Sequence, residues 1–142
     1  MKNKEYTMMV DVGAFPKEML VPLDAPFKDV RGKIQNLVNV PVGSVAIITS
    51  KAGTARSNHW HKNNWHYLYV ISGSMKYLEK NLDGTELKEL ICNAGDMVFT
   101  APEKIHRTEF LEETVLLSLG NTSKEHEHHG DGQREPEPFG GV

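Results

Sequence analysis

The sequence predicts an all-β protein that folds as a single jelly-roll β-barrel. Short runs rich in β-branched and aromatic residues follow one another from residue 42 to residue 120, and turn signals separate them. No long stretch has the period of a helix. Short strands spaced by about 8–12 residues are typical of β-sandwiches and barrels. A chain of 142 residues also suits one domain with one core.

Each expected strand is bounded by residues that favour turns. Pro41 ends the first run, and the next is rich in valine, isoleucine and threonine. Gly73 separates the two central runs, and Asp83-Gly84 between alternating runs predicts a hairpin. The expected strands cover residues 33–40, 42–51, 65–72, 74–81, 86–92, 97–100, 106–110 and 114–120.

Composition divides the chain into three zones. Residues 1–28 contain three prolines and are expected to form an N-terminal arm that can exchange a strand with a neighbour. Residues 29–120 are expected to form the barrel. Residues 121–142 form a polar tail, rich in glycine and proline, that buries too little apolar surface to order and is expected to be disordered.

Charge and hydropathy exclude several classes of partner. The net charge is −3 and no basic cluster is present, which argues against a nucleic-acid partner. No run of 18 apolar residues exists, so no membrane span is expected. Cys92 is the only cysteine, and the N-terminus has no apolar leader. These features favour the cytoplasm.

Four of the seven histidines lie in the strand-rich zone: His59, His61, His66 and His106. Residues i and i+2 of a strand point to the same face, so His59 and His61 present two imidazoles together. His66 shares its face with Leu68 and Val70, which indicates an inward position in the barrel.

The spacing of these histidines resembles the two motifs of the cupin superfamily. The first motif, G-x5-H-x-H-x3/4-E-x6-G, is matched by Gly53, His59, His61, His66 and Gly73. The second, G-x5-P-x-G-x2-H-x3-N, is matched at Gly95 and His106. The resemblance covers residues 29–120 and implies a cupin-type barrel.

The chain departs from the family pattern at several positions. His66 replaces the usual glutamate, Ala101 and Glu103 replace the proline and glycine of the second motif, and Phe110 replaces its asparagine. The resemblance implies that His59, His61, His66 and His106 hold one divalent transition metal. Imidazole suits zinc, copper, iron and nickel, so the residues alone do not select among iron, nickel, zinc, copper and manganese.

A metal held by four neutral ligands keeps its full charge, which favours an anionic small-molecule ligand. The leading expectation is therefore a metal-dependent enzyme with dioxygenase-like chemistry on an enolisable or anionic substrate. Arg56 or Arg107 would anchor the substrate, and Tyr69 or Tyr77 would donate a proton. The sequence does not select among these candidates.

Two alternatives remain open. Asp29-Val30-Arg31-Gly32 and the segment from Arg56 to Lys62 resemble cupin-like nucleotide-sugar epimerases and ketoisomerases, which implies a metal-independent site with His61 as general base and Arg56 on the phosphates. The other alternative is a module that binds a small molecule or metal without catalysis. The cupin resemblance also implies a homodimer, for which residues 5–12 offer an edge strand.

Overall fold

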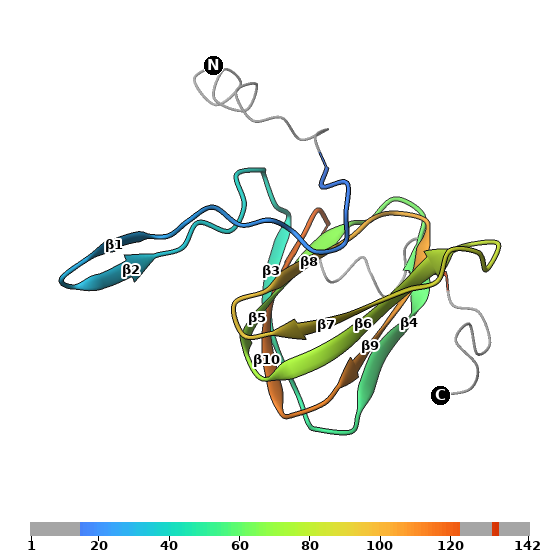
Figure 1. The fold of residues 1–142 in the computed structure, drawn as a ribbon. Coiled ribbons are helices and arrows are strands. Elements are labelled where there is room, and N and C mark those ends of the chain that lie inside the picture. Colours follow the sequence, from blue (N-terminus) through green and yellow to red (C-terminus); the bar gives the residue numbers. More distant parts are fainter. Residues whose placement is uncertain (1–14, 123–131, 134–142) are drawn as a thin grey trace, which may run out of the picture.

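The computed structural model describes residues 15–122 and 132–133, and all regular secondary structure in this part of the chain is β (Figure 1). Among these residues there is no helix long and apolar enough to cross a membrane. The all-β prediction is confirmed. The strands are β1 (Phe27–Asp29), β2 (Gly32–Ile34), β3 (Ser44–Ser50), β4 (Ala55–His61), β5 (His66–Ser72), β6 (Ser74–Asn81), β7 (Lys88–Asn93), β8 (Met97–Thr100), β9 (Lys104–Phe110), β10 (Thr114–Gly120) and β11 (Gly132–Gln133).

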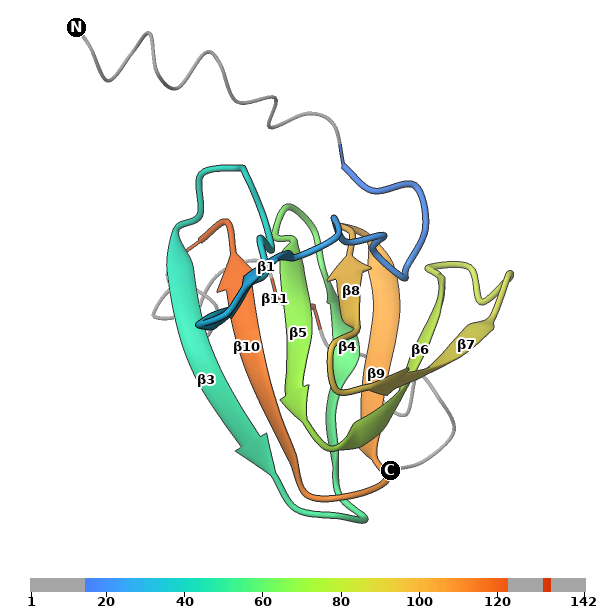
Figure 2. The same cartoon turned by 60° about the vertical axis from the view of Figure 1, so that its left-hand side comes forward.

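Two antiparallel sheets form the barrel (Figure 2). One has the strand order β3-β10-β5-β8, and the other has the order β11-β4-β9-β6-β7. Neighbouring strands in each sheet are mostly distant in sequence, as the long connections of a jelly roll require. The single jelly-roll barrel of cupin type is therefore confirmed.

The expected strand over residues 33–40 is wrong beyond Ile34. Here β1 and β2 form a separate hairpin that projects from the barrel (Figure 1). Leu37, Val38 and Val40 follow it without regular structure and pack on the barrel instead. Apolar residues can pack on a sheet without being part of a strand. The pattern of apolar positions therefore does not distinguish a strand from an irregular segment that covers a sheet.

The segment before the hairpin adds to the edge of β8. Leu20 forms a β-bridge with Val98, and the Val21 amide donates to the Met97 carbonyl at 2.8 Å. This segment therefore covers the edge of its own sheet. Residues 5–12, which we expected to exchange with a neighbour, lie outside the described residues.

The barrel interior is apolar at its centre. Inward side chains from both sheets form one buried cluster: Leu68, Val70, Met75, Tyr77, Cys92, Val98, Phe110 and Leu116. The inward parity expected for β5 is confirmed, because Leu68 and Val70 are both buried. This apolar centre supports the polar residues at one end of the barrel.

A second cluster lies on the outer face of the four-stranded sheet. It contains Trp65, Tyr67, Met97, Phe99 and Leu119, and partly buried residues of the 21–40 segment pack against it. The Tyr67 and Phe99 rings lie 4.9 Å apart. These aromatic side chains therefore serve packing on the outside of the barrel.

Most of the polar tail lies outside the described residues. Its described residues are 121–122, where Asn121 accepts a hydrogen bond from the Trp65 amide, and β11. Strand β11 pairs with the edge of β4, with Gly132 opposite His61 and Gln133 opposite Trp60. The backbone of this short strand thus runs beside the H-x-H segment.

Candidate active site

All four histidines of the barrel gather at one end. His59 and His61 are on β4, His66 begins β5 and His106 is on β9. The ring centroids of His59 and His106 are 4.9 Å apart, and those of His66 and His106 are 5.5 Å apart. The structure therefore brings the four histidines together, as expected, from three different strands.

The contact between His59 and His61 is the shortest in the cluster. Their Nε2 atoms are 3.0 Å apart, so one ring can donate a proton that the other accepts. A bulge precedes them: the β4–β9 register shifts between Ser57 and His59, and Ser57 and Asn58 have φ values of 75° and 67°. Left-handed backbone at residues other than glycine costs about 1–2 kcal/mol, and such positions concentrate at functional sites.

His106 is held in its neutral form. Its side chain is 1% exposed, and burial, with the nearby His66 and His59, lowers its pKa well below the ordinary value of 6.5. Its Nδ1 lies 3.3 Å from the Lys104 carbonyl, which requires Nδ1 to carry the proton. Nε2 is then an unprotonated acceptor, and it is buried with no hydrogen-bond partner in the described part of the chain.

Three of the four histidines meet the distance condition for a shared metal ion. Ring nitrogens of His59, His61 and His106 all lie within 4.8 Å of one another, and His66 is outside this group. The same closeness also suits a cluster of acid–base groups that pass protons between rings. Geometry alone therefore leaves two chemical interpretations.

A buried carboxyl group adjoins the histidines, and the sequence interpretation missed it. Glu79 on β6 pairs with His106 in the β6–β9 register. Its Oε1 lies 3.2 Å from the Tyr77 hydroxyl, which is also 2.6 Å from Thr100 Oγ1. The signal that could have found it is strand parity, because Glu79 shares a face with the buried Met75 and Tyr77.

Of the two tyrosine candidates, only Tyr77 reaches the cluster. Its ring stacks 6.4 Å from that of His106, and burial is the main cause that raises the pKa of its hydroxyl. Tyr69 points the other way, because it packs against the cluster on the outer face of the sheet. The structure therefore does not bring Tyr69 together with the histidines.

The two arginine candidates also lie apart from the histidines. Arg56 lies on β4 before the bulge at Ser57 and Asn58, and it pairs with Thr108 on β9, whereas His59 after the bulge pairs with His106. The Arg56 Nε donates to Ser50 Oγ at 2.7 Å in a hollow between the β3 and β4 ends. Arg107 alternates with His106 on β9, and its Nε donates to Glu109 Oε2 at 2.9 Å.

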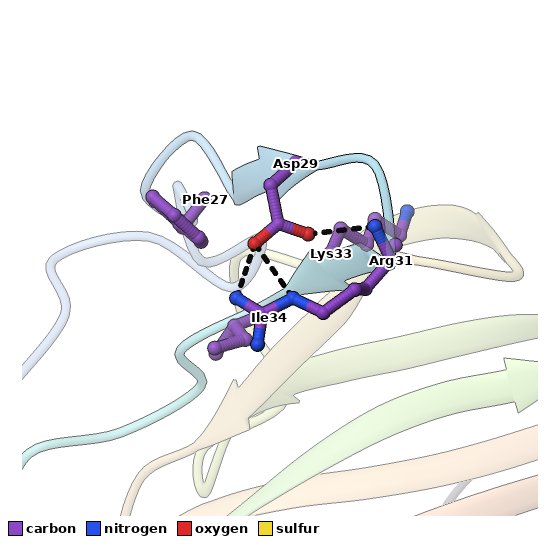
Figure 3. Close-up of a pocket in the computed structure, with 6 residues that line it drawn as sticks. Phe27, Asp29, Arg31, Lys33 and Ile34 are labelled. Carbon is purple, nitrogen blue, oxygen red and sulfur yellow. Dashed lines mark hydrogen bonds and ion pairs between the residues drawn. The ribbon is translucent and has the colours of Figure 1, made fainter.

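A second hollow lies on the projecting hairpin, far from the histidines. Its volume is about 230 Å³ and it is lined by Phe27, Asp29, Arg31, Gly32, Lys33 and Ile34 (Figure 3). Asp29 accepts hydrogen bonds from the backbone and guanidinium of Arg31, which lower the pKa of its carboxyl. The Asp29-Val30-Arg31-Gly32 segment is therefore a turn closed by hydrogen bonds between Arg31 and the Asp29 carboxylate.

The fold is shared with several solved structures. WlaRB, a TDP-quinovose 3,4-ketoisomerase from Campylobacter jejuni, superposes with a TM-score of 0.72 at 19% identity over 85% of this chain and 95% of that one. A double mutant of the QdtA 3,4-ketoisomerase from Thermoanaerobacterium thermosaccharolyticum, in complex with TDP, superposes with a TM-score of 0.67. The two sequences are 24% identical, and the match covers 82% of this chain and 86% of QdtA. These likenesses establish the fold.

Two further comparisons cover less. The Staphylococcus aureus capsular polysaccharide assembling protein CapF gives a TM-score of 0.61 at 23% identity over 80% of this chain, which spans only about a third (34%) of CapF. The model of the TehB-like domain family matches residues 53–119. No curated protein is similar enough to count as a match.

These comparisons correct the leading functional expectation. The structures that match over most of their length are named as 3,4-ketoisomerases, and the QdtA structure is in complex with TDP. Moving a ketone between neighbouring carbons is a transfer of protons, which needs neither dioxygen nor a redox metal. The expectations of a metal-dependent, dioxygenase-like enzyme and of a divalent transition metal as cofactor are therefore wrong. The error arose because the same imidazoles serve as metal ligands and as bases.

Proposed function

We propose that this protein is a nucleotide-sugar ketoisomerase that works without a metal ion. It would move a ketone between neighbouring carbons of a hexose linked to a nucleoside diphosphate. The observation that carries the proposal is the His59–His61 pair, with its 3.0 Å contact, in a fold shared along 95% of a TDP-quinovose 3,4-ketoisomerase. A histidine-to-asparagine variant of QdtA was solved with TDP-4-keto-6-deoxyglucose, which is the chemical class we propose.

His61 is the proposed base at the carbon beside the ketone. It is buried, and its Nε2 contact with His59 lets the two rings share one added proton. Two imidazolium rings at this distance would repel, whereas a single added proton can lie between the two Nε2 atoms. A base that holds a proton and then returns it to the neighbouring carbon suits a ketone shift.

The diphosphate of the substrate needs cationic partners near the histidines. Lys62 follows His61 directly and is exposed, and Lys104 precedes His106 by two residues at the start of β9. Both are closer in sequence to the nearest histidine than Arg56 is. The Arg56 guanidinium bonds to Ser50 and Thr49, and the Lys104 ammonium group donates to Asn81 Oδ1 beside the same end of β9. We therefore assign the phosphates to these lysines and leave Arg56 out of the site.

Turnover of TDP-4-keto-6-deoxyglucose, followed by proton NMR, tests this function. The protein should form the 3-keto isomer, and His61→Asn should reduce the rate by about 100-fold to 10,000-fold, since that is the range for loss of a general base. Tyr67→Phe, on the outer face of β5, is the control and should keep the rate. Binding of the nucleotide sugar without isomerisation would instead indicate a module that binds and does not catalyse.

We also propose that the active form is a homodimer. The β1–β2 hairpin projects from the barrel (Figure 1). The side chains of Phe27 (59% exposed), Ile34 (68% exposed) and Val30 (fully exposed) face solvent. A two-stranded hairpin is only marginally stable by itself. A second copy of the chain would cover these side chains. Light scattering should give the mass of two chains, and Phe27→Ser with Ile34→Ser should shift it towards one chain; a monomeric parent protein would refute the proposal.

A further inference from the structure

Glu79 is a carboxyl group inside the barrel, at the end where the histidines gather. It follows Met75 and Tyr77 on the inward face of β6, and its side chain is 8% exposed. A buried carboxyl group is costly unless hydrogen bonds or opposite charges compensate it. Among the described residues no lysine or arginine forms an ion pair with Glu79. Its position therefore requires an explanation beyond packing.

The partners of Glu79 form a short chain of hydroxyl groups. The Tyr77 hydroxyl lies 3.2 Å from Glu79 Oε1 and 2.6 Å from Thr100 Oγ1. Burial raises the pKa of Glu79, and the hydrogen bond from Tyr77 with the more distant Lys104 and Lys88 acts in the opposite direction. Burial raises the pKa of Tyr77, so its hydroxyl keeps its proton and holds Glu79 in position by a hydrogen bond.

Glu79 and the imidazole pair lie on different sides of His106. Glu79 faces His106 across the β6–β9 ladder, where directly opposite residues have Cβ atoms about 4.5–5.5 Å apart. The His59 ring lies 4.9 Å from the His106 ring, on β4, the other neighbour of β9. A sugar ring at this end could therefore meet a base on one side and a carboxyl group on the other.

A ketone shift between neighbouring carbons needs proton transfers at oxygen as well as at carbon. One base removes the proton from the carbon that carries the hydroxyl, and an enediol forms when the old carbonyl oxygen gains a proton. The new ketone then forms as the other oxygen loses its proton, while the base returns its own proton to the former carbonyl carbon. Two acid–base groups, one at carbon and one at oxygen, therefore suffice.

We infer that Glu79, held by Tyr77, is the second catalytic residue of this site and carries the proton between the two sugar oxygens. The inference rests on the proposed ketoisomerase function. Glu79 in its acid form gives its proton to the carbonyl oxygen, and as a carboxylate it takes the proton of the neighbouring hydroxyl. The carboxyl group ends as it began, and no oxidant, reductant or other reactant is needed.

The test uses the full chain and TDP-4-keto-6-deoxyglucose that carries deuterium at C3. Two rates are measured by NMR: loss of deuterium to water, which reports the base at carbon, and formation of the 3-keto isomer. Glutamine at position 79 can still donate a hydrogen bond to the carbonyl oxygen but cannot accept a proton. Glu79→Gln should therefore retain deuterium loss within about 10-fold and reduce isomerisation by about 100-fold or more.

Glu89→Gln is the matched control, because Glu89 lies on the adjacent β7 with an exposed side chain that pairs with Lys76. It should change neither rate. A second variant, Glu79→Asp, keeps the carboxyl group but shortens the side chain by one methylene group. It should lower the rate of isomerisation more than the rate of deuterium loss. This variant serves as the test if Glu79→Gln does not fold.

Two results would overturn the inference while the proposed function stands. The first is full isomerisation by Glu79→Gln, and the second is an equal fall of both rates in the variants, which a merely structural role would produce. If the unaltered protein forms no isomer, the proposed function fails, and the role of Glu79 fails with it.

Discussion

At the residue scale, the neutral form of His106 has a consequence for stability. Its folded pKa lies well below 6.5, whereas the unfolded chain has the ordinary value of about 6.5. Below that pH the unfolded state binds a proton that the folded state does not. The contribution of neutral His106 to the free energy of unfolding is therefore fully present above pH 6.5. It is lost as the pH falls towards the pKa of His106 in the folded state.

This sign predicts how acid acts on the protein. Between pH 6.5 and pH 5.5 the parent should lose about 1 kcal/mol of unfolding free energy relative to His106→Gln, measured by urea unfolding. The raised pKa of Glu79 acts in the opposite direction, but Glu79 is present in both proteins, so its effect cancels in the difference. Parallel curves for the two proteins would contradict the account of His106.

The sequence predicted some residues of the site and missed others for physical reasons. The i, i+2 spacing of His59 and His61 is a local property of a strand, so their common face was predictable. Glu79 shares the face of Met75 and Tyr77 on β6, but a charged residue near the end of a strand is normally expected to face solvent. The inward position of a carboxyl group depends on partners from β8 and β9, which are distant in sequence.

At the element scale, the turn between β5 and β6 explains why a glycine closes the first motif. Gly73 has a φ of 97°, and a Cβ there would lie 2.5 Å from both the Glu113 carbonyl oxygen and Thr114 Oγ1. The backbone of the β9–β10 connection thus passes directly over this turn. Strand lengths around it were predicted closely, because turn residues mark both ends.

Gly84 provides a matched control for this contact. It has a φ of 87°, but a Cβ there would meet nothing within 4 Å. Gly84→Ala should cost about 1 kcal/mol of unfolding free energy from backbone strain alone. Gly73→Ala should cost about 3 kcal/mol, because the clash adds to the strain. Equal losses in urea unfolding would contradict the close approach of the β9–β10 connection.

Elements whose geometry depends on distant contacts were not predictable. The bulge in β4 at Ser57 and Asn58 has only a weak local signal, because asparagine tolerates left-handed backbone but a single asparagine does not locate a bulge. The hairpin over residues 27–34 lies within a stretch that the apolar pattern joins to residues 35–40. Pattern alone does not tell a projecting hairpin from a barrel strand.

At the scale of the whole molecule, the barrel was predictable and its chemistry was not. Regular turns and short strands define a jelly roll without reference to any ligand. Four inward histidines, however, fit a metal site and an acid–base site equally well in sequence. The structure adds the 3.0 Å contact between His59 and His61 and the carboxyl group of Glu79 beside His106. Those features suit proton transfer to a sugar ketone.

The most direct test of this account is the isomerisation of TDP-4-keto-6-deoxyglucose by the full chain before and after complete removal of metal ions with a chelator. Metal content is measured on the same samples. We predict that the chelated protein forms the 3-keto isomer at an unchanged rate. No isomer in either sample, or isomer only when a divalent metal is returned, would contradict the account.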